Sequence, residues 1–229
     1  MTEAGAKPPR TYEPKDPAGL SRLVILFLWI DLVVGLFNGV STLAELQILG
    51  RLPMDTPVSL TEIPGLPPVA EVVRAVVGLA VLVSFVATGF LCLKWVYRVS
   101  LNAHALIPTL TISPGWAVGW YFVPIALLLK PFQAMKETWQ ASANPAAWRS
   151  VDTPSLLRWW WFLWLLSSIL GNLSFRLQLE AKSLDLVLAS DVVDIVGAVV
   201  AIPLNLVFIR IVRRVNDMQV GALSQRVFA

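Results

Sequence analysis

Four charged side chains stand inside or at the edge of long apolar runs, and they are the residues of this sequence that could carry chemistry: Asp31, Arg74, Asp191 and Asp194. An ionised group near the centre of a bilayer costs roughly 2.5–3.5 kcal/mol on insertion scales, so it normally faces the interior of a helix bundle and finds a partner there. Together these residues form a candidate intramembrane polar site.

Asp191 and Asp194 are three residues apart, a spacing that places both carboxylates on one face of a helix. One interpretation is a site for a proton or a cation. The other is structural, with hydrogen bonds between helices and a buried ion pair to Arg74. From the depths at which these residues enter their helices, we expect Arg74 to pair with Asp191 and to leave Asp194 without a cation.

The usual sequence motifs of enzymes are absent from the chain: it contains no GxSxG, HExxH, Walker loop or GxGD. Cys92 is the single cysteine and His104 the single histidine, which excludes an internal disulfide and a metal cluster of several histidines. We therefore predict no catalytic, cofactor-binding or metal-ligating residues and no cofactor.

The elements that must position the polar site are membrane helices. Of 229 residues, 56% are hydrophobic and 14% charged, whereas soluble domains carry about 25% charged residues. Long apolar runs predict an all-α, polytopic membrane helix bundle with four clear spans, at about 23–43, 69–97, 155–175 and 184–212. In such a protein an excess of Lys and Arg marks cytoplasmic loops, so the net charge of +3 does not indicate a nucleic-acid partner.

Two terminal segments lie outside this transmembrane domain of residues 21–215. Residues 1–20 are rich in proline and charge and predict a disordered cytoplasmic tail, and residues 216–229 predict a second cytoplasmic tail. The expected location is a bacterial plasma membrane, crossed several times, with the N-terminus in the cytoplasm.

The central segment, 114–142, raises the main question of topology. Its uncharged run, residues 116–129, has 14 residues, and a straight helix of that length covers about 21 Å of a hydrocarbon core of about 30 Å. Pro124 interrupts the run and Pro131 ends it. The segment is therefore re-entrant or interfacial, or a fifth span if one helix continues through both prolines.

Basic residues favour the first alternative. If the segment does not cross, 14 of the 18 basic residues lie on the side of both termini, whereas if it crosses the division is 8 against 10. The positive-inside rule prefers the former, with both termini cytoplasmic.

The end of the central segment predicts an amphipathic helix. After Pro131, which suits the first turn of a helix, Phe132, Met135 and Trp139 share one face, and Lys136 and Gln140 take the other with Gln133 and Glu137. The apolar face either lies on the membrane surface or packs on the protein's own helices.

The pattern W-x-x-x-W-Y-F-V-P at 116–124, followed by KPFQAMKETWQAS at 130–142, resembles a family of bacterial integral membrane proteins of unknown function (DUF4328). The matching residues are Trp116, Trp120, Pro124, Lys130, Pro131, Met135, Glu137 and Trp139. The resemblance implies a multispan membrane protein and carries no activity.

Three classes of function follow. The favoured one is a non-enzymatic membrane scaffold or partner protein, whose partners are the lipid bilayer and another membrane protein or a second copy of the chain. The alternatives are a small transporter or ion-coupled carrier that uses the intramembrane carboxylates, and a membrane enzyme of unrecognised type.

Overall fold

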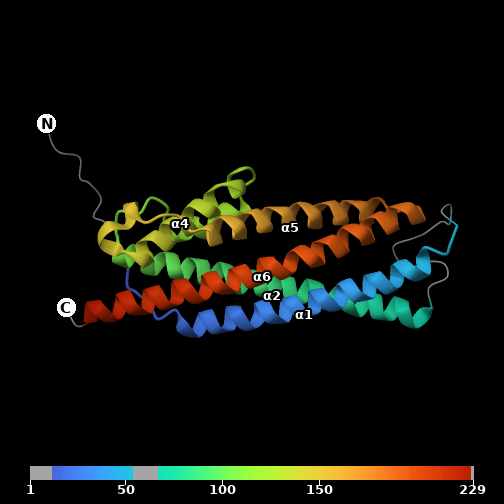
Figure 1. Cartoon of the computed structure of the whole chain (residues 1–229), viewed down its shortest axis with the longest axis horizontal. Coiled ribbons are helices and arrows are strands. Elements are labelled where there is room, and N and C mark those ends of the chain that lie inside the picture. Colours follow the sequence, from blue (N-terminus) through green and yellow to red (C-terminus); the bar gives the residue numbers. More distant parts are fainter. Residues whose placement is uncertain (1–11, 54–66, 228–229) are drawn as a thin grey trace. The chain divides into compact units, whose positions relative to one another are not determined.

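The computed structural model describes residues 12–53 and 67–227, and helices dominate both ranges. The four long ones are α1 (Ala18–Leu49), α2 (Pro68–Leu106), α5 (Ser155–Glu180) and α6 (Leu184–Val227) (Figure 1). Between α2 and α5 lie α3 (Pro114–Gly119), η1 (Trp120–Phe122), η2 (Ala126–Leu128), α4 (Lys130–Ala143) and η3 (Pro145–Ser150). These two ranges contain no strand, and the predicted all-α class is confirmed.

Three helices of the described ranges are long and apolar enough to cross a membrane: α1, α2 and the part of α6 from Leu184 to Ser224. They contain the expected spans 23–43, 69–97 and 184–212. The expected third span, 155–175, lies in α5, which does not belong to these three. Four clear spans are therefore not confirmed. The mean hydropathy of α5 is lowered by residues with polar groups: Trp159, Trp160, Trp161, Trp164, Ser167, Ser168 and Asn172.

The chain divides into two compact units, and each of the four long helices has residues in both. The head unit comprises residues 1–24, 91–157 and 211–229, and the bundle unit comprises residues 25–90 and 158–210. Each unit has its own contacts and is described by itself.

Polar contacts lie between the helices of the bundle unit. The Ser84 hydroxyl of α2 donates to Asp31 of α1 at 3.2 Å, and the Thr88 hydroxyl donates to the backbone carbonyl of Phe27 at 3.3 Å. Asn205 of α6 lies 3.5 Å from the other oxygen of Asp31. These bonds tie α1 to both α2 and α6, as polar side chains do inside membrane bundles.

Close apolar packing completes the bundle unit. A Cβ atom added to Gly39 of α1 would lie 3.2 Å from the Cβ of Ala198 of α6, so the two helix backbones approach closely there. Farther along α6, Phe208 stacks on Trp160 of α5, with ring centroids 5.5 Å apart. Leu49, Leu184 and Val187 form a small buried cluster where α1 ends and α6 begins.

The central segment, which lies in the head unit, is not one helix. The chain is extended at Val123, and Ile125 has a φ of 67°, a conformation rarely adopted by a β-branched residue. The regular structure on either side consists of α3, η1 and η2, with 6, 3 and 3 residues. The alternative of a continuous helix from Ser113 through Pro131 is therefore wrong, and the break falls at Pro124, where the ladder of helical hydrogen bonds was expected to fail.

The predicted amphipathic helix is confirmed as α4. Met135 and Trp139 are buried, at 1% and 7% exposure, and Phe132 is half-buried. Ala141 of the same helix belongs to a core cluster with Ala103, Leu106, Ile107 and Leu110 of α2 and the loop after it. The apolar face thus packs on the protein itself. The expectation that Gln140 stays in water is wrong, because its side chain is buried and donates to the carbonyl of Val151.

A buried polar network joins three helices of the head unit. The Gln219 side chain of α6 donates to the carbonyl of Val99 at 2.8 Å and to the hydroxyl of Ser142 at 3.0 Å. Its oxygen accepts from Asn102 of α2 at 2.9 Å. Asn102 also bonds both the N–H and the carbonyl of Lys15, each at 2.9 Å. The amide groups of Asn102 and Gln219 are thereby satisfied at 0% exposure.

This network changes the expected tails. Residues 1–11 of the predicted disordered tail lie outside the described residues, but Lys15 is fixed by Asn102 and α1 begins at Ala18, so the predicted boundary at residue 20 is too late. At the other end, α6 continues to Val227 and buries Gln219, so the segment 216–227 continues the last helix.

Candidate functional site

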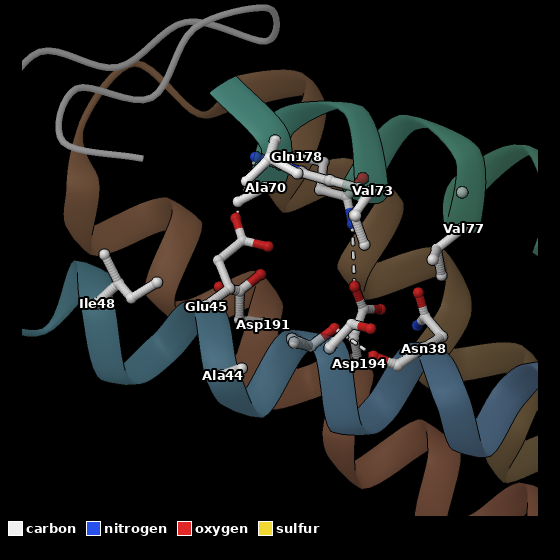
Figure 2. A pocket seen from close by; sticks show the side chains of 15 residues that line it. Asn38, Ala44, Glu45, Ile48, Ala70, Val73, Val77, Gln178, Asp191 and Asp194 are labelled. Atoms are coloured by element: carbon white, nitrogen blue, oxygen red, sulfur yellow. Dashed lines mark hydrogen bonds and ion pairs between the residues drawn. The ribbon is translucent and has the colours of Figure 1, made fainter. Parts of the chain in front are cut away.

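A cavity of about 470 Å³ lies among the four helices of the bundle unit (Figure 2). The polar side chains of α1 reach it at helical spacing, from Asn38 to Glu45, because residues three and four apart share a face. Arg74 of α2, Gln178 of α5 and both carboxylates of α6 line it as well, with Ile48, Val69, Val73 and Val77 as apolar walls. The structure thus brings Arg74, Asp191 and Asp194 together, as predicted.

The ion pair of Arg74 differs from the expected one. A guanidinium nitrogen of Arg74 lies 3.1 Å from Oε1 of Glu45, and this is the salt bridge that Arg74 makes among the described residues. Oε1 accepts no hydrogen bond there, so the contact is a charge pair without good hydrogen-bond direction. The predicted pairing of Arg74 with Asp191 is therefore wrong. The first span was expected to end at residue 43, but α1 continues to Leu49 and includes Glu45, which pairs with Arg74 instead.

Neither carboxylate of α6 forms a salt bridge with a described residue, although Asp191 was expected to pair with Arg74. Asp194 accepts a hydrogen bond from Gln178 at 3.1 Å, shown as the dashed line from Gln178 in Figure 2. Asp191 is more deeply buried, at 6% exposure, and its Oδ2 accepts no hydrogen bond from any described residue. Among the described residues, Asp191 rather than Asp194 is the carboxylate without a hydrogen-bond donor.

Asp31 does not line the cavity. Its two oxygens face Ser84 and Asn205, one on α2 and one on α6. The predicted four-residue site is therefore divided, with Asp31 in a separate contact between helices.

Sequence reasoning missed Glu45 and Gln178. A signal for Glu45 was present, because Asn38, Ser41, Thr42 and Glu45 form a polar stripe at helical spacing that continues beyond residue 43. Gln178 carries no such signal, since a single glutamine near the end of a helix is common on surfaces.

Replacing Arg74 by alanine is expected to destabilise the chain by about 1–2 kcal/mol, because it leaves the Glu45 carboxylate without its counter-charge. The figure is below that of a fully buried pair since the Arg74 side chain is 39% exposed. Thermal unfolding in detergent measures the loss, and Arg176→Ala, at an exposed position of α5, serves as the matched control.

The partner of Arg74 is identified by rescue. Glu45→Gln is expected to restore part of the stability of Arg74→Ala, since it removes the stranded charge, whereas Asp191→Asn restores less. Equal rescue by both, or better rescue by Asp191→Asn, would contradict the ion pair described here.

The motif residues of the central segment have internal roles in the head unit. Trp116 stacks on Trp120, with centroids 4.4 Å apart, and Lys130 donates to Gln133 at 3.2 Å. Pro124 precedes the left-handed Ile125. Pro131, Met135 and Trp139 are among the buried residues of α4.

Glu137 anchors the loop that precedes α3. Its carboxylate accepts from the backbone N–H groups of Thr111 and Ile112, at 3.0 and 3.2 Å, and from the Thr111 hydroxyl. Backbone N–H groups that point at one carboxylate fix the loop relative to α4. Glu137 was predicted on the polar face of the helix, and its carboxylate stabilises the fold by holding this loop on α4.

Comparison with known proteins gives a match to a family model. No curated protein and no solved structure matches the chain. A family model described as Domain of unknown function (DUF4328) matches residues 67–217, which include every motif residue named above and both carboxylates of α6. The match covers more than half of the sequence, and the chain belongs to the DUF4328 family.

Proposed function

We propose that this chain is a four-span, non-enzymatic integral membrane protein of the bacterial plasma membrane, with both termini in the cytoplasm, that serves as a scaffold or partner for other membrane proteins. The observation that carries the proposal is the inverted polarity of the bundle unit. Its polar side chains contact one another between helices, and its large apolar side chains face outward.

The outward apolar surface is extensive on α2. Its exposed residues in the bundle unit include Val69, Val72, Val76, Leu79, Leu82, Val83, Phe85, Val86 and Phe90, all of them more than half exposed. Water disfavours such a surface, whereas lipid chains match it. The side chains of Asp31, Ser84 and Thr88 point to partners inside instead.

The contacts of α5 support its place as the fourth span. Trp160 stacks on Phe208 and Gln178 bonds to Asp194, so α5 stays beside α6 over 14 residues of the latter, about 21 Å. With 26 residues, α5 is about 39 Å long and exceeds the hydrocarbon core of about 30 Å. These contacts and this length support α5 as a helix that crosses the membrane beside α6.

Single-cysteine labelling tests the topology. In a Cys92→Ser background, an impermeant thiol reagent applied to intact cells is expected to label Arg51→Cys and to spare Ala143→Cys and Ser224→Cys, all of which are exposed positions. After permeabilisation all three are expected to react, which controls for accessibility. Labelling of both Ala143→Cys and Ser224→Cys in intact cells would mean that the central segment crosses, and labelling of Ser224→Cys without Ala143→Cys would mean that α5 does not.

The cavity favours a second candidate, an ion-coupled carrier. Its support is the group of carboxylates that α1 and α6 bring to one cavity in the bundle unit. Proton flux into proteoliposomes distinguishes the two candidates, because a scaffold leaves the internal pH unchanged.

A further inference from the structure

The cavity of the bundle unit carries more negative than positive charge. Glu45, Asp191 and Asp194 line it with one basic residue, Arg74. The salt bridge neutralises Glu45, which leaves Asp191 and Asp194. A charge excess of this kind in a site of low dielectric is stable only if a cation or protons compensate it.

Asp191 adds an independent sign of a ligand. It is 94% buried, since its exposure is 6%, it lines the cavity, and its Oδ2 has no hydrogen-bond donor among the described residues. A buried carboxylate oxygen without a donor is costly, and a turn of the Asp191 side chain toward the cavity that it lines would bring this oxygen to the N–H group of a ligand.

From these two observations we infer that the cavity is a binding site for a primary ammonium group with a short apolar body, with the ammonium on Asp191. Asp194 lies on the same face of α6 and adds to the attraction. The site belongs to the bundle unit alone, and it is separate from the scaffold role proposed above.

The geometry favours an organic cation over a metal ion. In the part of the chain that the structure describes, no three Asp, Glu, His or Cys side chains are grouped so that they could hold a metal ion. The volume of about 470 Å³ falls in the range of small-molecule sites, roughly 300–1,000 Å³. Val73, Val77 and Ile48 offer apolar walls to an alkyl chain, and an ammonium brings the N–H donors that Asp191 lacks.

A primary ammonium group has two sources in a membrane. One is a soluble alkylamine, and the other is the headgroup of phosphatidylethanolamine. Val69 and Val73 line the cavity and are also exposed, at 69% and 42%, so both an aqueous and a lipid ligand have apolar surface to contact. The experiment needs one arm for each source.

The first arm uses the full chain in nanodiscs of phosphatidylcholine, whose quaternary headgroup has no N–H donor. Butylamine is titrated by calorimetry, with butanol as the uncharged control and sodium chloride as the metal-cation control. We expect saturable binding of butylamine alone. Asp191→Asn should weaken it by roughly tenfold or more, as expected when a buried hydrogen bond to a charge is lost. Asp185→Asn, the same change at an exposed position of α6, should leave it unchanged.

The second arm replaces part of the phosphatidylcholine by phosphatidylethanolamine. If the lipid is the source, this lipid raises the unfolding temperature of the unaltered chain and weakens butylamine binding, and neither effect occurs in Asp191→Asn. If a soluble amine is the source, butylamine binds equally well in both lipids.

A second variant guards against an Asp191→Asn chain that does not fold. Gly78 lines the cavity, and a Cβ added there meets no atom within 4 Å, so Gly78→Leu adds bulk from an open position and changes no charge. It should weaken ligand binding and keep the unfolding temperature. The inference is overturned if neither amine shows an effect that depends on Asp191, or if sodium competes with butylamine as well as a second alkylamine does.

Discussion

Replacing Gln219 by leucine is expected to destabilise the chain by about 2–4 kcal/mol, a large loss for a single polar side chain of the head unit. Gln219 is fully buried and makes three hydrogen bonds, to Val99, Ser142 and Asn102. Leucine keeps the volume but leaves one N–H of Asn102 without its acceptor and removes a donor from the Val99 carbonyl and the Ser142 hydroxyl, although these groups keep their other bonds, to Lys15 and Thr138 among them. Each unsatisfied group costs about 1–3 kcal/mol. Thermal and denaturant unfolding in detergent measure the loss.

Gln133→Leu is the matched control, because Gln133 is an exposed residue of α4 and its loss should change stability by less than about 0.5 kcal/mol. A double-mutant cycle with Asn102→Leu tests whether the groups act as one network. The double variant should lose less than the sum of the single variants, since each single change already breaks the hydrogen bond between Asn102 and Gln219. Strict additivity would show that the two amides do not depend on each other.

Hydrogen exchange separates a local effect from a global one. Asn102 holds the backbone of Lys15, so loss of the network should speed exchange at the Lys15 N–H before it affects the bundle unit. Equal exchange at Lys15 in the variant and the unaltered chain would contradict the network.

The elements of this fold follow from the sequence because apolar runs and prolines are local signals. The runs predicted α1, α2 and α6, and Pro124 predicted the break in the central segment. The i, i+3, i+7 spacing of Phe132, Met135 and Trp139 predicted α4 and its buried face. These predictions depend only on residues that are close together in the sequence, and the structure confirms them.

The partners of polar residues did not follow from the sequence, because they depend on how neighbouring helices are rotated. Arg74 is paired with Glu45 and not with Asp191, and depth along the helix alone did not distinguish them. Glutamine is usually a surface residue, yet Gln140 and Gln219 are buried, and Gln219 bonds to Val99, a residue far away in the chain. The sequence alone therefore does not predict whether a given glutamine is buried or exposed, because its burial depends on how the helices pack.

Gly39→Leu is expected to destabilise the bundle unit by about 2–3 kcal/mol, near the upper end of the usual cost of overpacking. A Cβ at Gly39 lies 3.2 Å from the Cβ of Ala198, which is tighter than an ordinary contact, and the remaining atoms of leucine have no room between α1 and α6. The helices must then separate, which also strains the contact of Asp31 with Asn205. Unfolding in detergent measures the loss.

Gly35→Leu is the matched control on the same helix, because a Cβ at Gly35 meets no atom within 4 Å. It should be neutral or stabilising by up to about 1 kcal/mol, since glycine is a poor residue in a helix interior. Gly39→Ala combined with Ala198→Gly supplies a finer test. The second change removes the methyl group that the first one meets, so the pair should be more stable than the sum of the single variants. Equal losses for Gly35→Leu and Gly39→Leu would show that general effects of leucine in α1, and not the approach of α1 to α6, set the stability of the bundle unit.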